Sequence, residues 1–147
     1  MVERVQASEV GAVVPLFDAY RQFYRQPSDR RRSRAFLAAR LRTQESAIFV
    51  ARVATRPVGF MQLYPTFSSI SLEPIWILND LYVVPRARRQ GIGGCLLKRA
   101  QKFAQDTGAA AILLETASGN PARKLYESLG WQLDQEFGHY RWDRKRF

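Results

Sequence analysis

The sequence contains little cysteine and no long apolar run. Its single cysteine, Cys95, permits no disulfide within the chain and fits a reducing compartment, so we expect the protein in the cytoplasm. No stretch of about 18 apolar residues occurs, and we therefore expect no membrane-spanning segment. Glu3 and Arg4 interrupt the apolar start that a secretory signal peptide requires, so no such leader is expected.

Acidic residues are also scarce. The chain of 147 residues has 13 Asp and Glu against 23 Lys and Arg, and its net charge is +10. The arginines cluster at 30–34, 86–89 and 141–146. Such a surface could bind nucleic acid, an acidic membrane or an anionic ligand, or could simply be solvated. No nucleic-acid motif accompanies the clusters, so nucleic acid is a disfavoured partner.

The length is that of one domain, residues 1–147, and the 46% of hydrophobic residues can supply a core. The apolar pattern predicts an α/β fold with a central mixed sheet flanked by helices. Strands are expected at 3–7, 47–53, 58–64, 74–84 and 109–115, with a terminal hairpin of 131–136 and 139–142. Helices are expected from Ser8 to about Arg25, from Asp29 past Leu41, from the turn at 88–94 to about Asp106, and from Asn120 to Gly130.

A glycine-rich turn, Arg88-Arg89-Gln90-Gly91-Ile92-Gly93-Gly94, joins the long expected strand to the following helix. Such a turn can direct several backbone N–H groups at one anion, because the first amides of a helix are unpaired and its macrodipole is positive there. Gly91 and Gly93 permit positive φ and close approach, since no Cβ intrudes. The turn is too short for a dinucleotide fingerprint and lacks the P-loop lysine. We infer a phosphate or pyrophosphate site.

Together with a second motif, this turn resembles the GNAT superfamily of acetyl-coenzyme-A-dependent N-acetyltransferases. Residues 88–93 match the family's pyrophosphate motif Arg/Gln-x-x-Gly-x-Gly/Ala, and residues 126–131 match Tyr-x-x-x-Gly-Phe with Trp131 in place of Phe. The resemblance implies the GNAT fold, a mostly antiparallel twisted sheet of about six to seven strands with about four helices. Tyr64 and residues 77–83 are most similar to the spermidine/spermine and histone/polyamine branch. Asn79 stands where polyamine enzymes often have Glu, which speaks against a polyamine acceptor.

The resemblance implies transfer of the acetyl group of acetyl-CoA, without a metal, to a primary amine of a small molecule by direct attack. Two alternatives stay open: acetylation of protein lysines or N-termini, and a non-catalytic module that binds acetyl-CoA. A homodimer is expected through the apolar side of the C-terminal hairpin, which carries Phe137, Tyr140, Trp142 and Phe147.

By the same resemblance, Tyr126 is the acid that protonates the departing thiolate. Asp80 is the candidate base, with Glu73 as a second, although Asp80 could instead be a structural hydrogen-bonding hub. Its side chain is expected to point opposite to that of Asn79. Acceptor-binding candidates are Tyr20, Tyr24, Tyr64 and Asn79, although aromatic residues at such spacing could be core. The implied coenzyme-binding residues are the strand edge Leu81, Tyr82 and Val83, the turn Arg88, Arg89, Gln90, Gly91, Ile92, Gly93 and Gly94, and Asn120, which is also explained as a helix cap.

Overall fold

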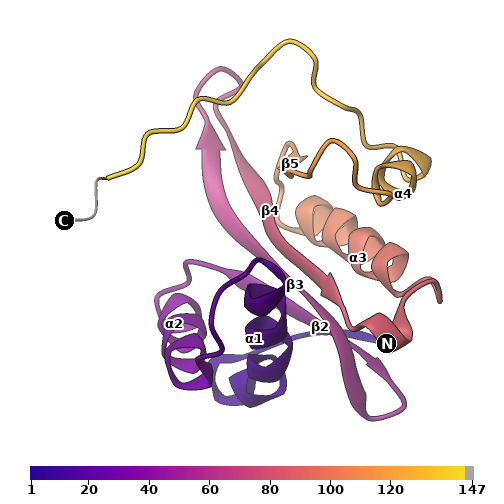
Figure 1. Cartoon of the computed structure of the whole chain (residues 1–147). Helices are drawn as coiled ribbons and strands as arrows, with labels where there is room; N and C mark the ends of the chain where they lie inside the picture. Colours follow the sequence, from indigo (N-terminus) through magenta and orange to yellow (C-terminus); the bar gives the residue numbers. More distant parts are fainter. Residues whose placement is uncertain (145–147) are drawn as a thin grey trace.

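A five-stranded sheet forms the centre of the computed structural model, which describes residues 1–144 (Figure 1). The strands lie side by side in chain order, antiparallel from β1 to β4 and parallel between β4 and β5. Their bounds are β1 Val2–Arg4, β2 Ala47–Val53, β3 Arg56–Ser68, β4 Glu73–Val83 and β5 Ile112–Leu113. The predicted α/β class and the mixed, mostly antiparallel sheet are confirmed.

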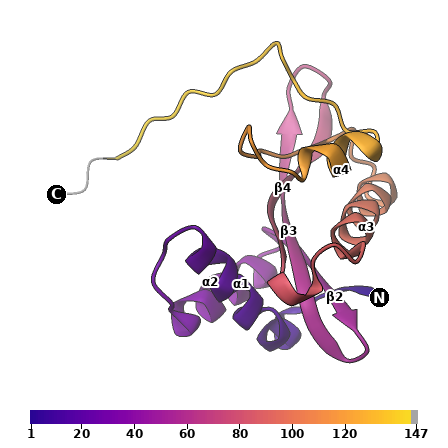
Figure 2. The same ribbon diagram turned by 45° about the vertical axis from the view of Figure 1, so that its right-hand side comes forward.

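Helices cover both faces of this sheet (Figure 2). One side carries α1 and α2, and the other carries α3 and α4. Their bounds are α1 Val14–Phe23, α2 Arg30–Arg42, α3 Ile92–Asp106 and α4 Arg123–Ser128, with short 3₁₀ helices η1 Ala7–Ala12 and η2 Pro85–Ala87. None of the helices among residues 1–144 has both the length and the apolar character needed to cross a membrane.

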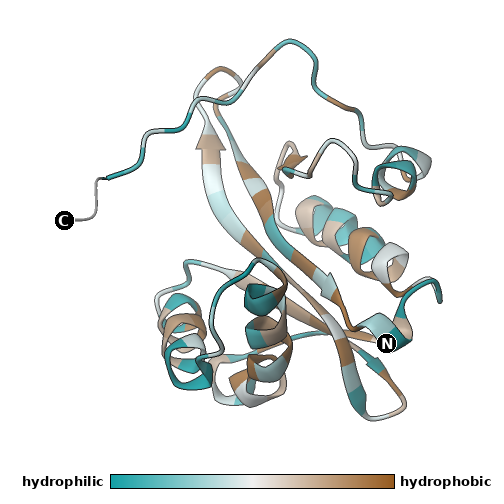
Figure 3. Cartoon of the chain, in the orientation of Figure 1, coloured by the Kyte–Doolittle hydropathy of each residue, from teal (hydrophilic) through white to brown (hydrophobic). Residues whose placement is uncertain are grey.

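The apolar run of β2 is explained by burial on both faces. Ile48 and Val50 pack toward α1 and α2, whereas Ala47, Phe49 and Ala51 pack toward α3. A strand covered on both sides is apolar throughout, instead of alternating with polar residues. In Figure 3, by contrast, the long strands β3 and β4 carry hydrophobic bands interleaved with hydrophilic ones. The sheet thus separates two cores.

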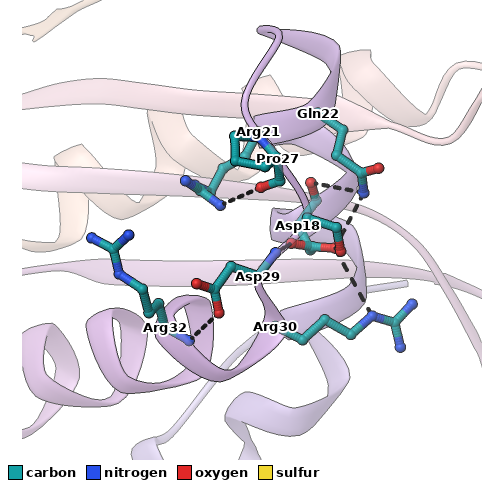
Figure 4. Close-up of polar contacts among 8 residues, drawn as sticks. Asp18, Arg21, Gln22, Pro27, Asp29, Arg30 and Arg32 are labelled. Carbon is teal, nitrogen blue, oxygen red and sulfur yellow. Dashed lines mark hydrogen bonds and ion pairs between the residues drawn. The ribbon is translucent and has the colours of Figure 1, made fainter.

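A buried carboxylate ties α1 to the start of α2 (Figure 4). Asp18 is 2% exposed and accepts hydrogen bonds from Ser28 Oγ at 2.6 Å and the Asp29 amide at 2.8 Å, with Arg30 Nε at 4.0 Å. Burial by itself raises the pKa of Asp18, but these hydrogen bonds and the nearby guanidinium groups outweigh it and hold the pKa below its usual value. Asp29 in turn caps α2 as predicted, since its side chain accepts from the Arg32 amide at 3.0 Å. Together these bonds fix α2 against α1.

A β-bulge interrupts β4 at Asn79. Gln62 of β3 pairs with Asp80, and the next residue, Leu63, pairs with Leu78, so Asn79 has no partner. The extra residue breaks the alternation of side chains between the two faces. Leu78 packs toward α3 before the bulge, and Leu81 does so after it. In an unbroken strand Leu78 and Leu81 would lie on opposite faces of the sheet. Because of the bulge, they lie on the same face.

The predicted number of strands is wrong. The expected hairpin of 131–136 and 139–142 is not formed: residues 132–144 run as extended, exposed chain without strand pairing in the described part of the molecule (Figure 1). The expected strand 109–115 is reduced to β5, where Leu113 is 53% exposed. A two-stranded hairpin is marginal in water unless one face is covered. No element of residues 1–144 covers this one.

The first helix also differs from the prediction. It is split into η1 and α1, because Pro15 has no N–H to continue a helix and instead occupies the first turn of α1. Ser8 lies inside η1 rather than capping it. Other boundaries are confirmed: α3 ends at Asp106 before Gly108 in the left-handed region, and Gly130 follows α4 in the same conformation.

Candidate functional site

The sheet has an open edge at the end of β4. β5 pairs with β4 only at Trp76 and Ile77, so the following residues of β4 have no strand on that side within residues 1–144. The Val83 carbonyl accepts a hydrogen bond from Arg88 Nε at 2.8 Å and therefore faces away from β3. Because successive residues of a strand direct their backbone groups to opposite edges, those of Leu81 also face the opening, and those of Tyr82 face β3.

The glycine-rich turn follows directly and presents unpaired amides. Within the described chain, the N–H groups of residues 89–94 donate to no backbone or side-chain acceptor, and the first such bond of α3 runs from the Cys95 amide to the Gly91 carbonyl at 3.0 Å. Gly91 has φ +79° and Arg89 has φ +61°. The expectation of positive φ at Gly93 is wrong, because Gly93 already lies in the first turn of α3. These N–H groups form a cradle for an oxyanion.

Arg88 is held at this turn by more than one contact. Besides its bond to β4, its guanidinium lies 5.6 Å from the centre of the Tyr82 ring and 5.9 Å from that of Phe23. Gln90 Nε2 donates to the Arg86 carbonyl at 3.3 Å. The side chains of the turn therefore brace its backbone, and the amides remain available for a ligand.

A polar network connects the loop after β5 to α4. Asn120 Nδ2 donates to Thr116 Oγ1 at 2.9 Å, and Asn120 Oδ1 accepts from the Ala122 amide at 3.0 Å. Asn120 thus stabilises the approach to α4, although the N-cap position itself is Ala122. Half-buried Tyr126 packs beside Trp131; burial raises the pKa of its hydroxyl, and hydrogen bonding from Thr116 partly offsets this. Asn120, Thr116 and Tyr126 therefore belong to one network.

A cleft of about 490 Å³ opens between α1, α2 and the bulge of β4. Its residues come from these elements and from β3. They are Phe17, Tyr20, Arg21, Arg32, Ser33, Ala35, Phe36, Tyr64, Asn79 and Asp80.

Asp80 is the buried acid of this cleft, with 4% of its surface exposed. It accepts hydrogen bonds from Gln62 Nε2 at 2.5 Å and from Asn79 Nδ2 at 3.0 Å, and Tyr20 lies beside it. Burial raises the pKa of Asp80, and these hydrogen bonds offset only part of that rise. The expectation that Asp80 and Asn79 point to opposite faces is wrong, because the bulge brings both to the cleft.

Two of the predicted acceptor-binding tyrosines line the cleft. Burial raises the pKa of Tyr64 to about 12 and raises that of Tyr20 as well, and the nearby Asp80 charge adds to both shifts. Tyr20 also donates to the Asn79 carbonyl at 3.4 Å. Tyr24 is 59% exposed and lies outside the cleft, packed edge-on against Tyr20.

Three further titratable residues lie outside the cleft. Glu73, the second candidate base, is exposed at the start of β4 and is not part of the cleft. His139 is exposed and faces Glu115 at 3.3 Å. Cys95 is exposed on α3. Among residues 1–144, no group of three or more His, Cys, Asp or Glu side chains could hold a metal ion.

Several cleft residues were missed by the sequence analysis. Arg21, Arg32 and Ser33 lie on helical segments whose charges look solvated in a linear sequence. Gln62 lies within an apolar strand, is fully buried and bonds Asp80. A buried amide one strand away from a buried acid is a signal that could have identified it, because both groups need partners.

A family model described as "Acetyltransferase (GNAT) family" matches residues 13–131, which include both the cleft and the glycine-rich turn. The chain belongs to the GNAT family of acetyltransferases. GNAT proteins use acetyl-CoA as a cosubstrate, and the prediction of an acyltransferase enzyme is confirmed at this level.

Similar proteins agree with the family. An uncharacterized N-acetyltransferase of Bacillus subtilis, YhfO, is 48% identical over 140 residues, which cover 95% of this chain and 94% of that protein. A probable acetyltransferase of Haemophilus influenzae is 33% identical and covers 85% of each chain. The crystal structure of a probable acetyltransferase, 41% identical, superposes with a TM-score of 0.92 over 100% of this chain and 99% of that one. The GNAT fold is therefore confirmed, whereas the polyamine branch stays a prediction.

Stability measurements can distinguish two roles of Asp80, a hydrogen-bonding hub that supports the fold and a buried acid whose burial costs stability. The pKa of Asp80 is higher in the folded protein than in the unfolded chain, so the protonated carboxyl stabilises the fold. This stabilisation is complete at pH values below the ordinary carboxyl pKa, and it is lost as the pH rises through the folded-state pKa. We expect Asp80→Asn to be at least as stable as the wild type at pH 8, by up to about 3 kcal/mol, because a buried charge is removed. The measurement is urea unfolding from pH 4 to pH 8.

Glu73→Gln, an exposed change on the same strand, is the control and should show no such pH trend. If Asp80→Asn were clearly less stable than the wild type at every pH, Asp80 would be a structural hub.

Proposed function

We propose that this chain transfers the acetyl group of acetyl-CoA to a primary amine of a small molecule. The observation that carries this proposal is a buried carboxyl, Asp80, which lines an aromatic cleft and lies on β4, the strand with the open edge. A volume of about 490 Å³ suits a small molecule. The cleft is walled by α1 and α2, whereas a peptide substrate would need a long open groove.

The open edge and the cradle fit the coenzyme. The backbone groups of Leu81 and Val83 can pair with the pantetheine arm as with an added strand. The free amides of residues 89–94 can bind the pyrophosphate, with attraction from Arg86 and Arg89. Bound there, acetyl-CoA supplies a thioester whose acyl carbon can accept an amine. The groups assigned to it are backbone donors and acceptors of the open edge and the turn, together with basic side chains beside them; of these backbone groups, the Val83 carbonyl already accepts a bond from Arg88 Nε.

Asp80 is positioned to act on the acceptor. An ammonium group has no lone pair, so it must lose a proton before it can attack. Burial raises the pKa of Asp80 toward the working pH, which makes it a better proton acceptor than an exposed carboxylate. Gln62 and Asn79 hold both of its oxygens in place. The proton of the ammonium group passes to Asp80.

Tyr126 is the proposed donor at the other end of the reaction. The leaving sulfur needs a proton, and the high pKa of Tyr126 keeps the hydroxyl protonated at neutral pH. The neighbouring Thr116 lowers the pKa of Tyr126 and so offsets part of the rise that burial causes. Asn120 fixes Thr116 from its other side. The C–S bond breaks as the C–N bond forms, the O–H proton of Tyr126 passes to the sulfur, and the proton still carried by the nitrogen of the new amide replaces it on the Tyr126 oxygen.

Coenzyme binding tests the proposal directly. We expect titration calorimetry to detect acetyl-CoA binding, and Gly91→Val to weaken it about tenfold, because φ +79° strains any residue with a Cβ by about 1–2 kcal/mol. Gly108→Val is the matched control: its φ is +72°, it faces open space, and it lies at the far end of α3. Absence of coenzyme binding in the wild type would refute the proposal.

The role of Tyr126 is tested by rate. We expect Tyr126→Phe to reduce kcat by about 10²–10⁴-fold and leave coenzyme affinity unchanged, because general-acid help is lost while the ring still packs on Trp131. Thiol release with a panel of small amines is the measurement. Tyr140→Phe, which removes a fully exposed hydroxyl, is the control. An unchanged kcat in Tyr126→Phe would remove Tyr126 from the mechanism.

We also propose a homodimer in which the C-terminal segment covers the edge beyond β5 of a second copy. Large apolar side chains are exposed on this segment and on the β3–β4 turn. They are Phe67, Ile70, Leu72, Leu133, Phe137, Tyr140 and Trp142. Phe147, also assigned to this surface from the sequence, lies outside the described residues. Exposed apolar groups beside an unpaired strand edge favour association.

Sedimentation equilibrium should therefore give a dimer at micromolar concentration. Removal of residues 133–147 should give a monomer, because the segment that pairs with β5 is lost. A monomeric wild type would contradict the dimer without affecting the proposed chemistry.

A further inference from the structure

The cleft is lined by side chains of both charges. Asp80 comes from β4 of the sheet, and the helices contribute Arg21 and Arg32. Among residues 1–144, no other acid lines the cleft. A polyamine, which is positive along its whole length, would meet these two guanidinium groups unfavourably. The charge pattern therefore indicates a ligand that is itself of mixed charge.

The acids near the two arginines are already engaged. Asp18 is held by Ser28, the Asp29 amide and Arg30, and Asp29 caps α2 through the Arg32 amide. Neither Arg21 nor Arg32 forms an ion pair within residues 1–144. Figure 4 shows the guanidinium groups of Arg21 and Arg32 on the side of Asp18 that is opposite to Arg30. Arg21 Nη1 donates to the Pro27 carbonyl at 3.2 Å, which holds that side chain in position.

A buried hydroxyl lies next to the arginines. Ser33 is 2% exposed, lines the cleft, and its Oγ has no hydrogen-bond partner within the described chain. A buried polar group without a partner is costly, so such groups in folded proteins are nearly always satisfied. A ligand oxygen in the cleft would provide the missing partner. This hydroxyl and the two guanidinium groups together match an oxyanion.

Much of the lining is aromatic. Phe17, Tyr20, Phe36 and Tyr64 line the cleft, and the Phe17 and Phe36 rings are stacked with centroids 6.1 Å apart. Aromatic walls suit an apolar or aromatic body. The cleft thus matches a molecule with an amine, an apolar middle and an anionic group.

We propose that the acceptor is an amine that also carries an anionic oxygen group, a carboxylate or a phosphate, bound by Arg32, Arg21 and Ser33 while its amino group faces Asp80. This inference rests on the proposed function, because it assigns the acceptor of the same site. Two charged ends also orient the ligand, so only the amine end reaches the acid.

Matched pairs of amines test the inference by turnover. Phenylalanine and phenethylamine differ by a carboxylate, and O-phosphoethanolamine and ethanolamine differ by a phosphate. We expect kcat/KM to be at least tenfold higher for the anionic member of one pair, since a charge-assisted contact of this kind is worth about tenfold to hundredfold in affinity. The pair that shows the preference identifies the anion. Equal rates within both pairs would overturn the inference and leave the proposed function standing.

Arg32→Gln should remove that preference. Among residues 1–144 its side chain forms no hydrogen bond or ion pair, so its loss should not disturb the fold. The expected result is a ratio that falls toward one through a higher KM for the anionic amine. Arg31→Gln is the matched control, because Arg31 is exposed on the same helix turn but does not line the cleft. If Arg31→Gln lost the preference for the anionic amine as much as Arg32→Gln, the preference would come from the overall positive charge of the surface. That result would overturn the inference.

Binding provides a readout that does not need turnover. 3-Phenylpropionate and phenyl phosphate carry the anion without an amine, and calorimetry should show that one of them binds the wild type and binds Arg32→Gln about tenfold more weakly. If neither anion binds, the inference is refuted even where neutral amines are acetylated. If an anion binds as expected but no amine of any kind is acetylated, the proposed function fails and the acceptor assignment fails with it.

Discussion

The β-bulge at Asn79 is the constraint on which the site depends. One extra residue in β4 reverses the alternation of side chains, so Asp80 faces α1 and α2 while Leu78 and Leu81 both face α3. Without the bulge, the carboxyl would point into the core under α3, where apolar side chains such as Leu96 and Leu97 could not hydrogen-bond it. The bulge therefore places the one buried acid of the cleft where ligands can reach it.

Burial of the Asp80 carboxylate costs free energy, and the surrounding residues reduce this cost without removing it. Asp80 is desolvated, and the hydrogen bonds from Gln62 and Asn79 only partly compensate. Asp18 shows the contrast within the same chain: it is equally buried, yet its bonds from Ser28 and Asp29 lower its pKa. One acid is therefore fully satisfied and joins α1 to α2, whereas the other is held in a state that favours proton uptake. This difference is the one expected between a structural carboxylate and the catalytic carboxyl that we propose for Asp80.

Local signals explain which parts of the structure the sequence could predict. The cap at Asp29, the end of α3 before Gly108 and the extent of β2 depend on neighbouring residues, and all three were predicted. The bulge depends on the register between β3 and β4, which no single segment encodes, so the direction of Asp80 was predicted wrongly. The C-terminal hairpin has the right residue pattern, but a pattern forms strands only where a partner covers them. Arg32 was missed because a charged helix residue looks the same whether it faces water or a cleft.

The two halves of the site use different kinds of groups. The turn at 89–94 and the open edge at Leu81 and Val83 offer backbone donors and acceptors, whose direction depends on the fold and not on side-chain identity. The cleft is built from side chains of α1, α2, β3 and the bulge, which can change without altering the course of the sheet. Membership of the GNAT family therefore says much about the coenzyme half and little about the acceptor half. The acceptor has to be inferred from this chain's own side chains, and these combine one buried acid, Asp80, with the two guanidinium groups of Arg21 and Arg32.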